Sequence, residues 1–382
     1  MHTEKFEKIR NEQFPLTAKY AYLNTATSGM ISKRAKEAMV AHIEDRFETA
    51  LDGAKLNANF AFLDGLRETA AAMFHADRDE IFFGSAASTM INVFSAGIEL
   101  PENANIVTSG LTFPSTPYTW MNRVGVENVR IAAPVDGKMP PENLFALVDE
   151  NTAVLSLCLV ENTTGFKHDL KTISAFCQEK GIYLVLDVTQ CIGAMEIDVK
   201  KTPVDFITTS SFKWLGNVFG MGFSYISKRV MDQVAPVYVG WTGNQNRMDH
   251  SKYVLNLSEG AARYETGIPN WVGLKGMEQG MQLYLELGKE DVEAYILGLT
   301  DYLYERVAQT EHLRILGDFA PENRSGLSYA CFPEEWELTN DILMEKGIFT
   351  SVVGKTVRVA LHYYNNKADV DRLVDFLMNY QK

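Results

Sequence analysis

The feature that most constrains the fold is an alternation of short apolar runs and amphipathic stretches between about residues 80 and 230. Several runs are continuously apolar, which is typical of strands buried on both faces of a sheet. The connecting segment DLKTISAFCQEKG offers Asp169 and Gly181 as the caps of a helix. Strand–helix–strand repetition predicts an α/β fold whose mostly parallel sheet is sandwiched by helices. The predicted strands are EIFFG, NIVTSG, NVRIAA, TAVLSLCLV, IYLVLDV, DFITTSS and GFSYIS.

The pattern changes after about residue 255, where two long amphipathic helices precede short strands and a final helix. We therefore predict a large domain over residues 20–255 and a smaller α+β C-terminal domain over residues 256–382. Residues 1–19 are expected to pack against the smaller domain. Because no repeat or low-complexity linker separates the two domains, we expect them to pack closely.

Composition excludes several classes of function. Of 382 residues, 46% are apolar and 22% charged, an ordinary globular balance. The net charge of -13, without a Lys/Arg-rich run, argues against nucleic-acid and membrane partners. The N-terminus lacks an apolar signal core, no apolar run is long enough to span a bilayer, and the four cysteines form no C-x-x-C pair. We expect a cytoplasmic protein with reduced thiols, and the histidine spacing indicates no metal site.

Two ionisable residues are predicted at one edge of the sheet. Asp187 ends the apolar run IYLVLD, and Lys213 follows the strand DFITTSS within the stretch SSFKWLG. Open α/β sheets bind ligands at the carboxyl ends of their strands. A lysine there can form a Schiff base with an aldehyde cofactor, and an acid can pair with a pyridine nitrogen. Taken alone, Asp187 fits equally well as a strand-end aspartate that caps the next helix.

The spacing Ser210-x-x-Lys213 also matches the nucleophile and base of an acyl-serine enzyme. That interpretation requires S-D-N and K-T-G elements as well, and the sequence contains neither. We therefore favour the aldehyde-binding interpretation of Lys213.

A phosphate site is predicted where EIFFG continues through small residues into a helix. The free amides at a helix start carry a partial positive charge of roughly half a unit, which attracts anions. Ala86, Ala87 and Ser88 are small enough for a phosphate to approach the backbone, and Ser210 adds a hydroxyl. By itself, the same pattern also fits an ordinary N-capped helix.

Three further residues extend the candidate site. Phe113 in TFPSTPYTW offers an aromatic platform for a planar cofactor, and Asn162 in ENTTGF follows another strand. In KTVRVALHYY, strand alternation sends Arg358 to the face opposite its valine neighbours, where a guanidinium can hold a carboxylate. The plainer alternatives are a core phenylalanine and an edge-strand arginine that faces solvent.

These pieces, in this order, resemble the class V aminotransferase family of fold-type I pyridoxal-phosphate enzymes. That group includes cysteine desulfurases, selenocysteine lyases, isopenicillin-N epimerase-like proteins and kynureninases. The resemblance runs from YLNTATSG at residues 22–29, through ARYETGIPN, to the segment RVALHYYNNKADVDRLVDFL. It implies pyridoxal 5′-phosphate as cofactor, a homodimer with active sites at the subunit interface, and the region of Gly267 and Asn270 near the partner's active site.

The resemblance also implies individual roles. Lys213 would hold the cofactor aldehyde and move protons, while Asp187 would bind the pyridine nitrogen. Gln190 would bind the ring's phenolic oxygen, and Phe113 would stack on the ring. Further residues would contact the cofactor (Ala86, Ala87, Ser88, Asn162, Thr189 and Ser210) or the substrate (Arg358 at its carboxylate, with Asn24 and Thr27).

The sequence departs from the family's pattern at four places, and these differences limit which reactions we expect. Phe113 and Phe212 stand where many desulfurases have histidines, and Ile268 stands where the family often has a phosphate-binding threonine. The segment EKGIFTSVVGKTVRV lacks the cysteine that a persulfide-forming desulfurase needs, and Cys331 lies earlier, in a predicted strand. We predict an aminotransferase acting on an amino acid, with a cysteine- or selenocysteine-lyase-like or epimerase activity as the alternative. A non-catalytic ligand-binding protein is a remote alternative, against which the Lys213 and Asp187 pair argues.

Overall fold

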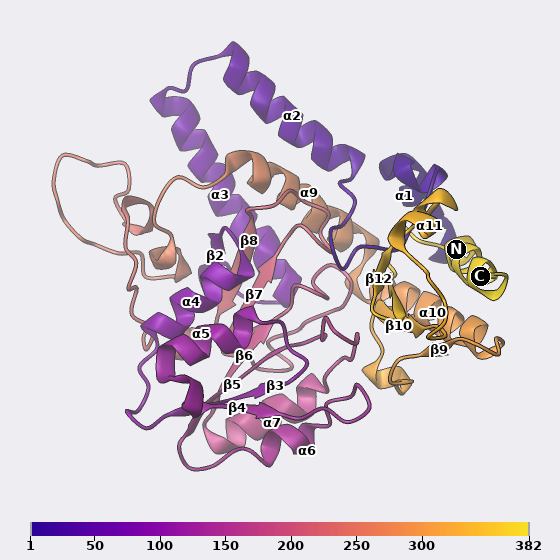
Figure 1. Ribbon diagram of the computed structural model, residues 1–382. Helices are drawn as coiled ribbons and strands as arrows, with labels where there is room; N and C mark the ends of the chain where they lie inside the picture. The colour runs from indigo at the N-terminus through magenta and orange to yellow at the C-terminus, as the bar shows by residue number, and fades with distance from the viewer. Residues whose placement is uncertain (1, 381–382) are drawn as a thin grey trace.

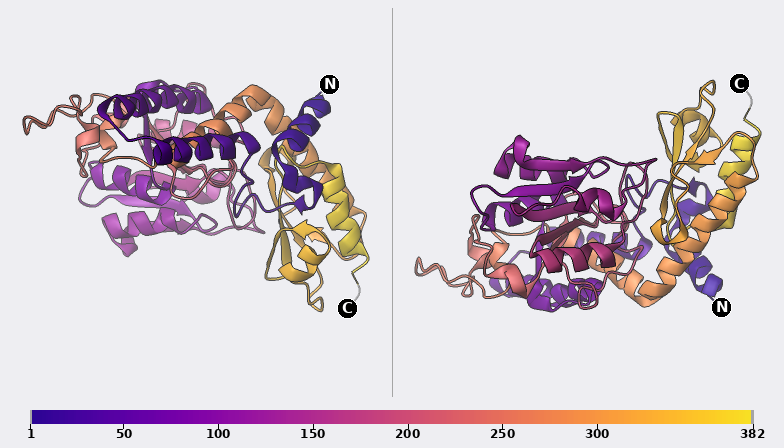
Figure 2. Two further views of the ribbon diagram at one scale, coloured as in Figure 1. Left: turned by 90° about the horizontal axis from the view of Figure 1, so that it is seen from above. Right: turned by 90° about the horizontal axis from the view of Figure 1, so that it is seen from below.

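The computed structural model describes residues 2–380 and has two lobes (Figure 1). The larger lobe is built on a central sheet, and the smaller lobe lies at one end of it and carries both termini (Figure 2). None of the helices in the described chain is long and apolar enough to cross a lipid bilayer.

The large lobe contains a seven-stranded sheet in the order β2-β8-β7-β6-β5-β3-β4. Neighbours from β7 to β4 pair in parallel, whereas β8 runs antiparallel to both β2 and β7. The predicted mostly parallel sheet is therefore confirmed. Its strands are β2 (Ile81–Gly84), β3 (Asn105–Ser109), β4 (Val129–Ala132), β5 (Thr152–Cys158), β6 (Tyr183–Asp187), β7 (Phe206–Ser210) and β8 (Gly222–Ile226).

Helices cover both faces of this sheet because its strands are apolar on both faces. Val154, Val185 and Phe206 join the core under α4 and α5, whereas Leu184 and Ile207 join the core under α3, α7 and α9. The large-lobe helices are α2 (Lys33–Glu48), α3 (Gly53–Phe74), α4 (Ala87–Gly97), α5 (Ser115–Val124), α6 (Pro141–Phe145), α7 (Leu170–Lys180), α8 (Lys228–Met231) and α9 (Trp271–Leu287). The predicted caps of α7 are present: the Asp169 carboxylate accepts the Thr172 amide, and Gly181 is left-handed.

The small lobe has a four-stranded antiparallel sheet in the order β12-β13-β10-β9. A short parallel pair, β1 with β11, connects the N-terminal segment to it. The remaining elements are β1 (Ala21–Tyr22), β9 (Arg314–Ile315), β10 (Leu327–Cys331), β11 (Ile348–Phe349), β12 (Ser351–Val353), β13 (Thr356–Ala360), α1 (His2–Gln13), α10 (Lys289–Ala308), α11 (Asn340–Glu345) and α12 (Lys367–Met378).

The two ends of the chain meet in the small lobe. Arg10 of α1 forms a buried ion pair with Asp369 of α12 at 2.6 Å and also donates to the Tyr364 carbonyl. By contrast α9, which follows the proposed boundary at residue 255, packs against α2 and α3 of the large lobe. The division into domains at residues 255 and 256 stays a prediction, and α9 is the element that joins the two lobes.

A buried ion pair fixes the segment that leads to α9. Arg67 of α3 and Glu265 are paired by two hydrogen bonds, of 2.7 and 2.6 Å. The same carboxylate accepts the Phe83 amide of β2 at 2.9 Å, and Arg67 also donates to the Ile81 carbonyl. The pair therefore ties α3, β2 and the segment before α9 together.

We predict that Arg67→Met lowers the free energy of unfolding by about 3–5 kcal/mol, because it leaves the Glu265 carboxylate buried without its partner. Urea unfolding of the cofactor-free protein measures this change. The matched control is Lys33→Met, which removes an exposed ion pair with Glu37 and is expected to cost under about 1 kcal/mol. Equal losses in the two variants would contradict the anchoring role.

Candidate active site

The candidate site lies where β5, β6 and β7 end side by side. In the sheet register, Asp187 at the end of β6 is level with Cys158 of β5 and Thr208 of β7. Lys213 follows Ser210, the last residue of β7. The parallel pairing thus brings Asp187 and Lys213 to one edge of the sheet, as the sequence predicts.

Burial shifts the pKa values of these two groups in opposite directions. It raises the pKa of the Asp187 carboxyl, although hydrogen bonds from Thr189 and the charge of Lys213 oppose the shift. Burial lowers the pKa of the Lys213 amine, and here the charge of Asp187 opposes it. The amine is therefore neutral, and able to act as a nucleophile or base, at a lower pH than an ordinary lysine.

Two aromatic rings lie near Lys213, and its backbone makes a close contact with the N-terminal segment. Its Nζ lies 5.7 Å from the ring centroids of both Phe113 and Phe212. The Gly29 amide donates to the Phe212 carbonyl at 2.9 Å. A Cβ at position 29 would lie 1.9 Å from the Lys213 carbonyl oxygen, so only glycine allows this approach.

The residues that are predicted to bind the phosphate lie at or near the start of α4. Its N-cap, Ala86, makes no side-chain hydrogen bond to the helix, so no capping side chain of its own covers the positive end of α4, where an anion can bind. Ser210 Oγ accepts the Ala87 amide at 2.9 Å, and the Ser210 amide donates to Thr189 Oγ1 at 3.1 Å. Ser88 is exposed and its hydroxyl contacts that of Ser115 at 2.6 Å. The residues predicted to bind the phosphate therefore lie together where α4 begins and β7 ends: Ala86, Ala87, Ser88, Thr189 and Ser210.

A cavity of about 1230 Å³ opens beside the start of α4. Its lining includes Ser88 and Thr89 of α4 together with Gly267, Ile268 and Asn270. The sequence-predicted interface residues thus lie next to the candidate phosphate site of their own chain.

Gln190 is held in place at both ends of its amide. The Trp214 indole donates to Gln190 Oε1 at 3.1 Å, and Gln190 Nε2 donates to the Ala26 carbonyl at 3.3 Å. Because an amide nitrogen carries two hydrogens, one N–H remains for a ring oxygen.

Arg358 on β13 is held by the N-terminal segment. Its Nη2 donates to Asn24 Oδ1 at 3.2 Å, to Ser351 Oγ at 3.4 Å and to Thr27 Oγ1. Its buried Nε has no hydrogen-bond partner among residues 2–380. The structure therefore brings Asn24 and Thr27 to Arg358, and the guanidinium keeps donors for a ligand.

Sequence reasoning missed Tyr329 and Ser351. Tyr329 of β10 lies directly opposite Arg358 in the sheet, and its hydroxyl donates to the Asn162 carbonyl. Burial raises the pKa of the Tyr329 hydroxyl. The segment GLSYACF predicts the strand, but only the pairing register shows that Tyr329 faces the site. Asn162 itself is half-buried, and its Oδ1 has no partner among the described residues.

The cysteines do not supply an accessible thiol. All four are free and buried, and Cys331 lies within β10. Burial raises the pKa of Cys158, which lies beside Asp187, well above its ordinary value. These thiols therefore lack the properties of a reactive cysteine.

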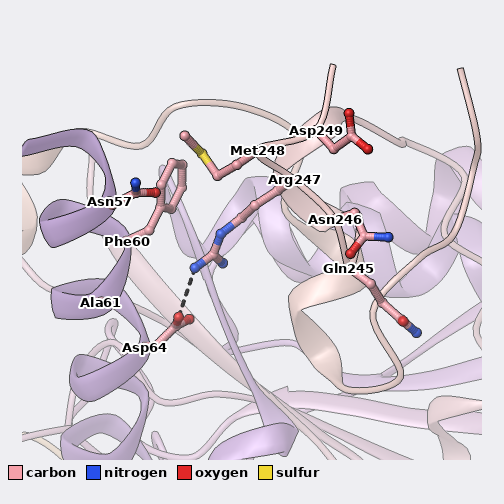
Figure 3. A pocket seen from close by; sticks show the side chains of 9 residues that line it. All are labelled: Asn57, Phe60, Ala61, Asp64, Gln245, Asn246, Arg247, Met248 and Asp249. Atoms are coloured by element: carbon pink, nitrogen blue, oxygen red, sulfur yellow. Dashed lines mark hydrogen bonds and ion pairs between the residues drawn. The ribbon is translucent and has the colours of Figure 1, made fainter. Parts of the chain in front are cut away.

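Another cavity, of about 830 Å³, lies outside this site (Figure 3). It separates α3 from residues 245–249, and Arg247 crosses it to donate to Asp64 at 2.8 Å. It contains none of the predicted site residues. Within residues 2–380, no group of three or more His, Cys, Asp or Glu side chains is placed to hold a metal ion.

The gathered residues fit pyridoxal phosphate. They provide an amine of lowered pKa, a buried acid, an aromatic face at Phe113 and a helix start without a side-chain cap. The unpartnered Asn162 Oδ1 lies on the turn that follows β5. This donor set matches an aldehyde, a pyridine nitrogen, a planar ring and a phosphate.

A sequence model for aminotransferase class-V matches residues 22–373. The chain belongs to this family. The predicted family and its cofactor, pyridoxal phosphate, are therefore confirmed, and the protein is an enzyme of the class V pyridoxal-phosphate group.

Relatives within the family have different names. The chain is 25% identical to a probable cysteine desulfurase of Methanothermobacter thermautotrophicus, with 97% of each chain covered. It is 22% identical to an uncharacterized aminotransferase, YcbU, of Bacillus subtilis, with 95% of each covered.

Solved structures share the fold. C-DES, a cystine C–S lyase solved with its product cysteine persulfide, has a TM-score of 0.88 at 20% identity, covering 97% of this chain and 100% of that one. A cysteine desulfurase of Thermococcus onnurineus has a TM-score of 0.83 at 19% identity, covering 97% of each. At this identity the likeness shows the fold alone.

We predict that Asp187→Asn stabilises the cofactor-free protein at neutral pH. The folded pKa of Asp187 is raised, so the folded protein binds the proton more tightly and wild-type stability falls as pH rises from 3.8 through the folded pKa. The variant has no such cost, so its advantage should disappear at the acid end of this range. Urea unfolding across this pH range measures the difference.

The matched control for Asp187→Asn is a substitution that should change the free energy of unfolding in the opposite direction. Hydrogen bonds from Asn105 and Arg130 lower the pKa of the half-buried Asp149 carboxyl. Asp149→Asn should therefore destabilise the protein at neutral pH, with the loss shrinking as pH falls. A destabilised Asp187→Asn variant at neutral pH would contradict the burial argument.

Proposed function

We propose that the protein is an aminotransferase that acts on an amino acid through Lys213. The observation that carries this proposal is the opposite pKa shift of Lys213 and Asp187 at one edge of the sheet. Arg358, held by Asn24 and Thr27, supplies the site for the substrate carboxylate.

Each residue has a distinct task in this proposal. Lys213 would hold the cofactor aldehyde and, as a neutral amine, would take and return protons. Asp187 would pair with the pyridine nitrogen, and the Ser88 amide at the start of α4, together with the Ser210 hydroxyl, would bind the phosphate. Bound pyridoxal phosphate supplies a ring that withdraws electrons from the substrate α-carbon.

The surroundings of Lys213 favour transamination over elimination. A poor leaving group on the β-carbon requires a proton donor, and neither Phe113 nor Phe212 can donate one. Transamination expels no leaving group, and its proton transfers would fall to the neutral amine of Lys213. The buried cysteines also argue against a persulfide-forming desulfurase.

A C–S lyase is the second candidate. The observations that favour it are the 25% identity to a probable cysteine desulfurase and the structural likeness to the cystine C–S lyase. Persulfide and other acidic thiols leave without a strong proton donor, so such substrates remain compatible with Phe113 and Phe212. Epimerisation requires the same residues and would appear as racemised substrate.

We further propose a cytoplasmic homodimer. Val237, Tyr238, Val239 and Ile268 are exposed apolar side chains that line the same cavity beside the start of α4. A contiguous exposed apolar surface is typical of an association surface. The region of Gly267 and Asn270 would then lie near the partner's active site.

The visible absorption spectrum tests the central proposal. We predict that the purified protein with added pyridoxal phosphate is yellow, and that an aminotransfer substrate from an amino-acid panel bleaches it persistently. Lys213→Ala should lose turnover by at least about 10²-fold, because it removes the proton-transfer group, and should lose the borohydride-reducible link to the cofactor.

Different outcomes separate the candidates. Colour that returns while pyruvate or a thiol accumulates would favour the lyase. Racemised substrate with unchanged colour would favour the epimerase. A wild-type protein that stays colourless after pyridoxal phosphate is added would contradict the proposed function. The remaining hypothesis would then be a non-catalytic ligand-binding protein.

We predict that Arg358→Ala raises KM for an α-amino acid about 10- to 100-fold, because a charged hydrogen bond contributes about 1.5–3 kcal/mol. The change should be small for an amine that lacks the carboxylate. The matched control is Arg372→Ala in α12, which donates to the Lys346 carbonyl outside the site. An unchanged KM in Arg358→Ala would remove this residue from substrate binding.

A further inference from the structure

Glu161 and His168 form a buried pair that the proposed reaction does not use. Glu161 Oε1 lies 2.8 Å from His168 Nε2, and both side chains are 0% exposed. The other two polar atoms, Glu161 Oε2 and His168 Nδ1, have no hydrogen-bond partner among residues 2–380. Each side chain therefore depends on the other, because burying an unpaired polar group is costly.

The pair closes a turn at the end of β5. The Glu161 amide donates to the Phe166 carbonyl at 2.9 Å, and the Gly165 amide returns to the Glu161 carbonyl at 2.8 Å. The His168 amide donates to the Leu159 carbonyl at 3.1 Å. Residues 160–168 thus form a compact turn with the pair at its base and Asn162 near its tip.

The small lobe contacts this turn through hydrogen bonds and close backbone packing. The Lys167 amide donates to the Asn323 carbonyl at 2.9 Å, and Ser325 Oγ donates to the Gly165 carbonyl at 2.7 Å. Gly165 has a φ of +79°, and a Cβ there would lie 1.9 Å from the Leu327 carbonyl oxygen. The turn is therefore a joint between the two lobes.

The same turn contacts both sides of the candidate site. Thr163 Oγ1 donates to the Leu111 carbonyl at 3.0 Å, two residues before Phe113. Tyr329 donates to the Asn162 carbonyl and lies opposite Arg358 in the β10–β13 pair. A shift of the turn would therefore move Arg358 relative to Lys213.

We propose that Glu161 and His168 are positioning residues that set the distance between Arg358 and Lys213. Through the turn they hold the small lobe where the enzyme binds substrates with a carboxylate on the amine-bearing carbon. This inference rests on the proposed function, because it takes Arg358 as the carboxylate site. Neither residue is assigned a contact with substrate or cofactor.

The kinetic test compares single and double alanine variants of the pair. Glu161→Ala and His168→Ala should each raise KM for the amino acid about 10-fold, with kcat within about twofold and little change in Ki for the matching amine that lacks the carboxylate. The double variant should be no worse than either single variant, because the two residues act as a unit. Glu161→Gln keeps an oxygen acceptor for His168 and should behave like wild type.

A second measurement does not depend on turnover. Amide hydrogen exchange of the holoenzyme should increase in residues 323–329 and 356–360 of the alanine variants, as well as in the turn itself. If an alanine variant fails to fold, Ser325→Ala removes the hydrogen bond from the small lobe to the Gly165 carbonyl of the turn while leaving the pair intact. This variant should raise the same KM and the exchange of residues 356–360.

The outcomes are distinguishable. Lower thermal stability with unchanged KM, or faster exchange confined to residues 160–168, would show a purely local structural role and overturn the inference. Equal losses for the amino acid and the amine would do the same. Failure of the proposed function would instead appear in wild type, as the absence of a cofactor spectrum.

Discussion

The candidate site depends on burying one acid and one amine at the edge where parallel strands end. Taking either charge out of water is unfavourable, and the protein accepts that cost at Asp187 and Lys213. Because β5, β6 and β7 pair in register, the sheet fixes the position of Asp187. Burial then leaves more of the lysine in its neutral amine form and raises the proton affinity of the acid, so that Asp187 could share a proton with a pyridine nitrogen.

A second constraint joins the two lobes through a few residues near the N-terminus. Gly29 packs on the Lys213 carbonyl, while Asn24 and Thr27 of the same segment hold Arg358. The segment therefore relates the lysine of the large lobe to the arginine of the small lobe. The turn at residues 160–168 relates the same two lobes from the other side. Two separate sets of contacts thus hold the two lobes together near Lys213 and Arg358.

The sequence predicts the parts of the structure that depend on local pattern. Continuous apolar runs indicate the sheet, and a strand's end indicates where Asp187 and Lys213 lie. It does not predict the register that sets Tyr329 opposite Arg358, or the contact between Gln190 and Trp214. Those depend on how distant segments pack. For the same reason, the sequence suggests a boundary before α9, whereas the packing of α9 on α2 and α3 appears only in three dimensions.

Phe113 and Phe212 bear both on the pKa of Lys213 and on the type of reaction that we propose. Burial lowers the pKa of the Lys213 amine, and Phe113 and Phe212 are aromatic rings that lie near its Nζ. Histidines at these positions would add proton donors for a leaving group, but they would also add polarity around the lysine. With phenylalanine at both positions, the proposed proton-transfer role would remain with Lys213, which would serve transamination directly. Under that proposal, elimination would be restricted to groups that leave without acid assistance, such as an acidic thiol.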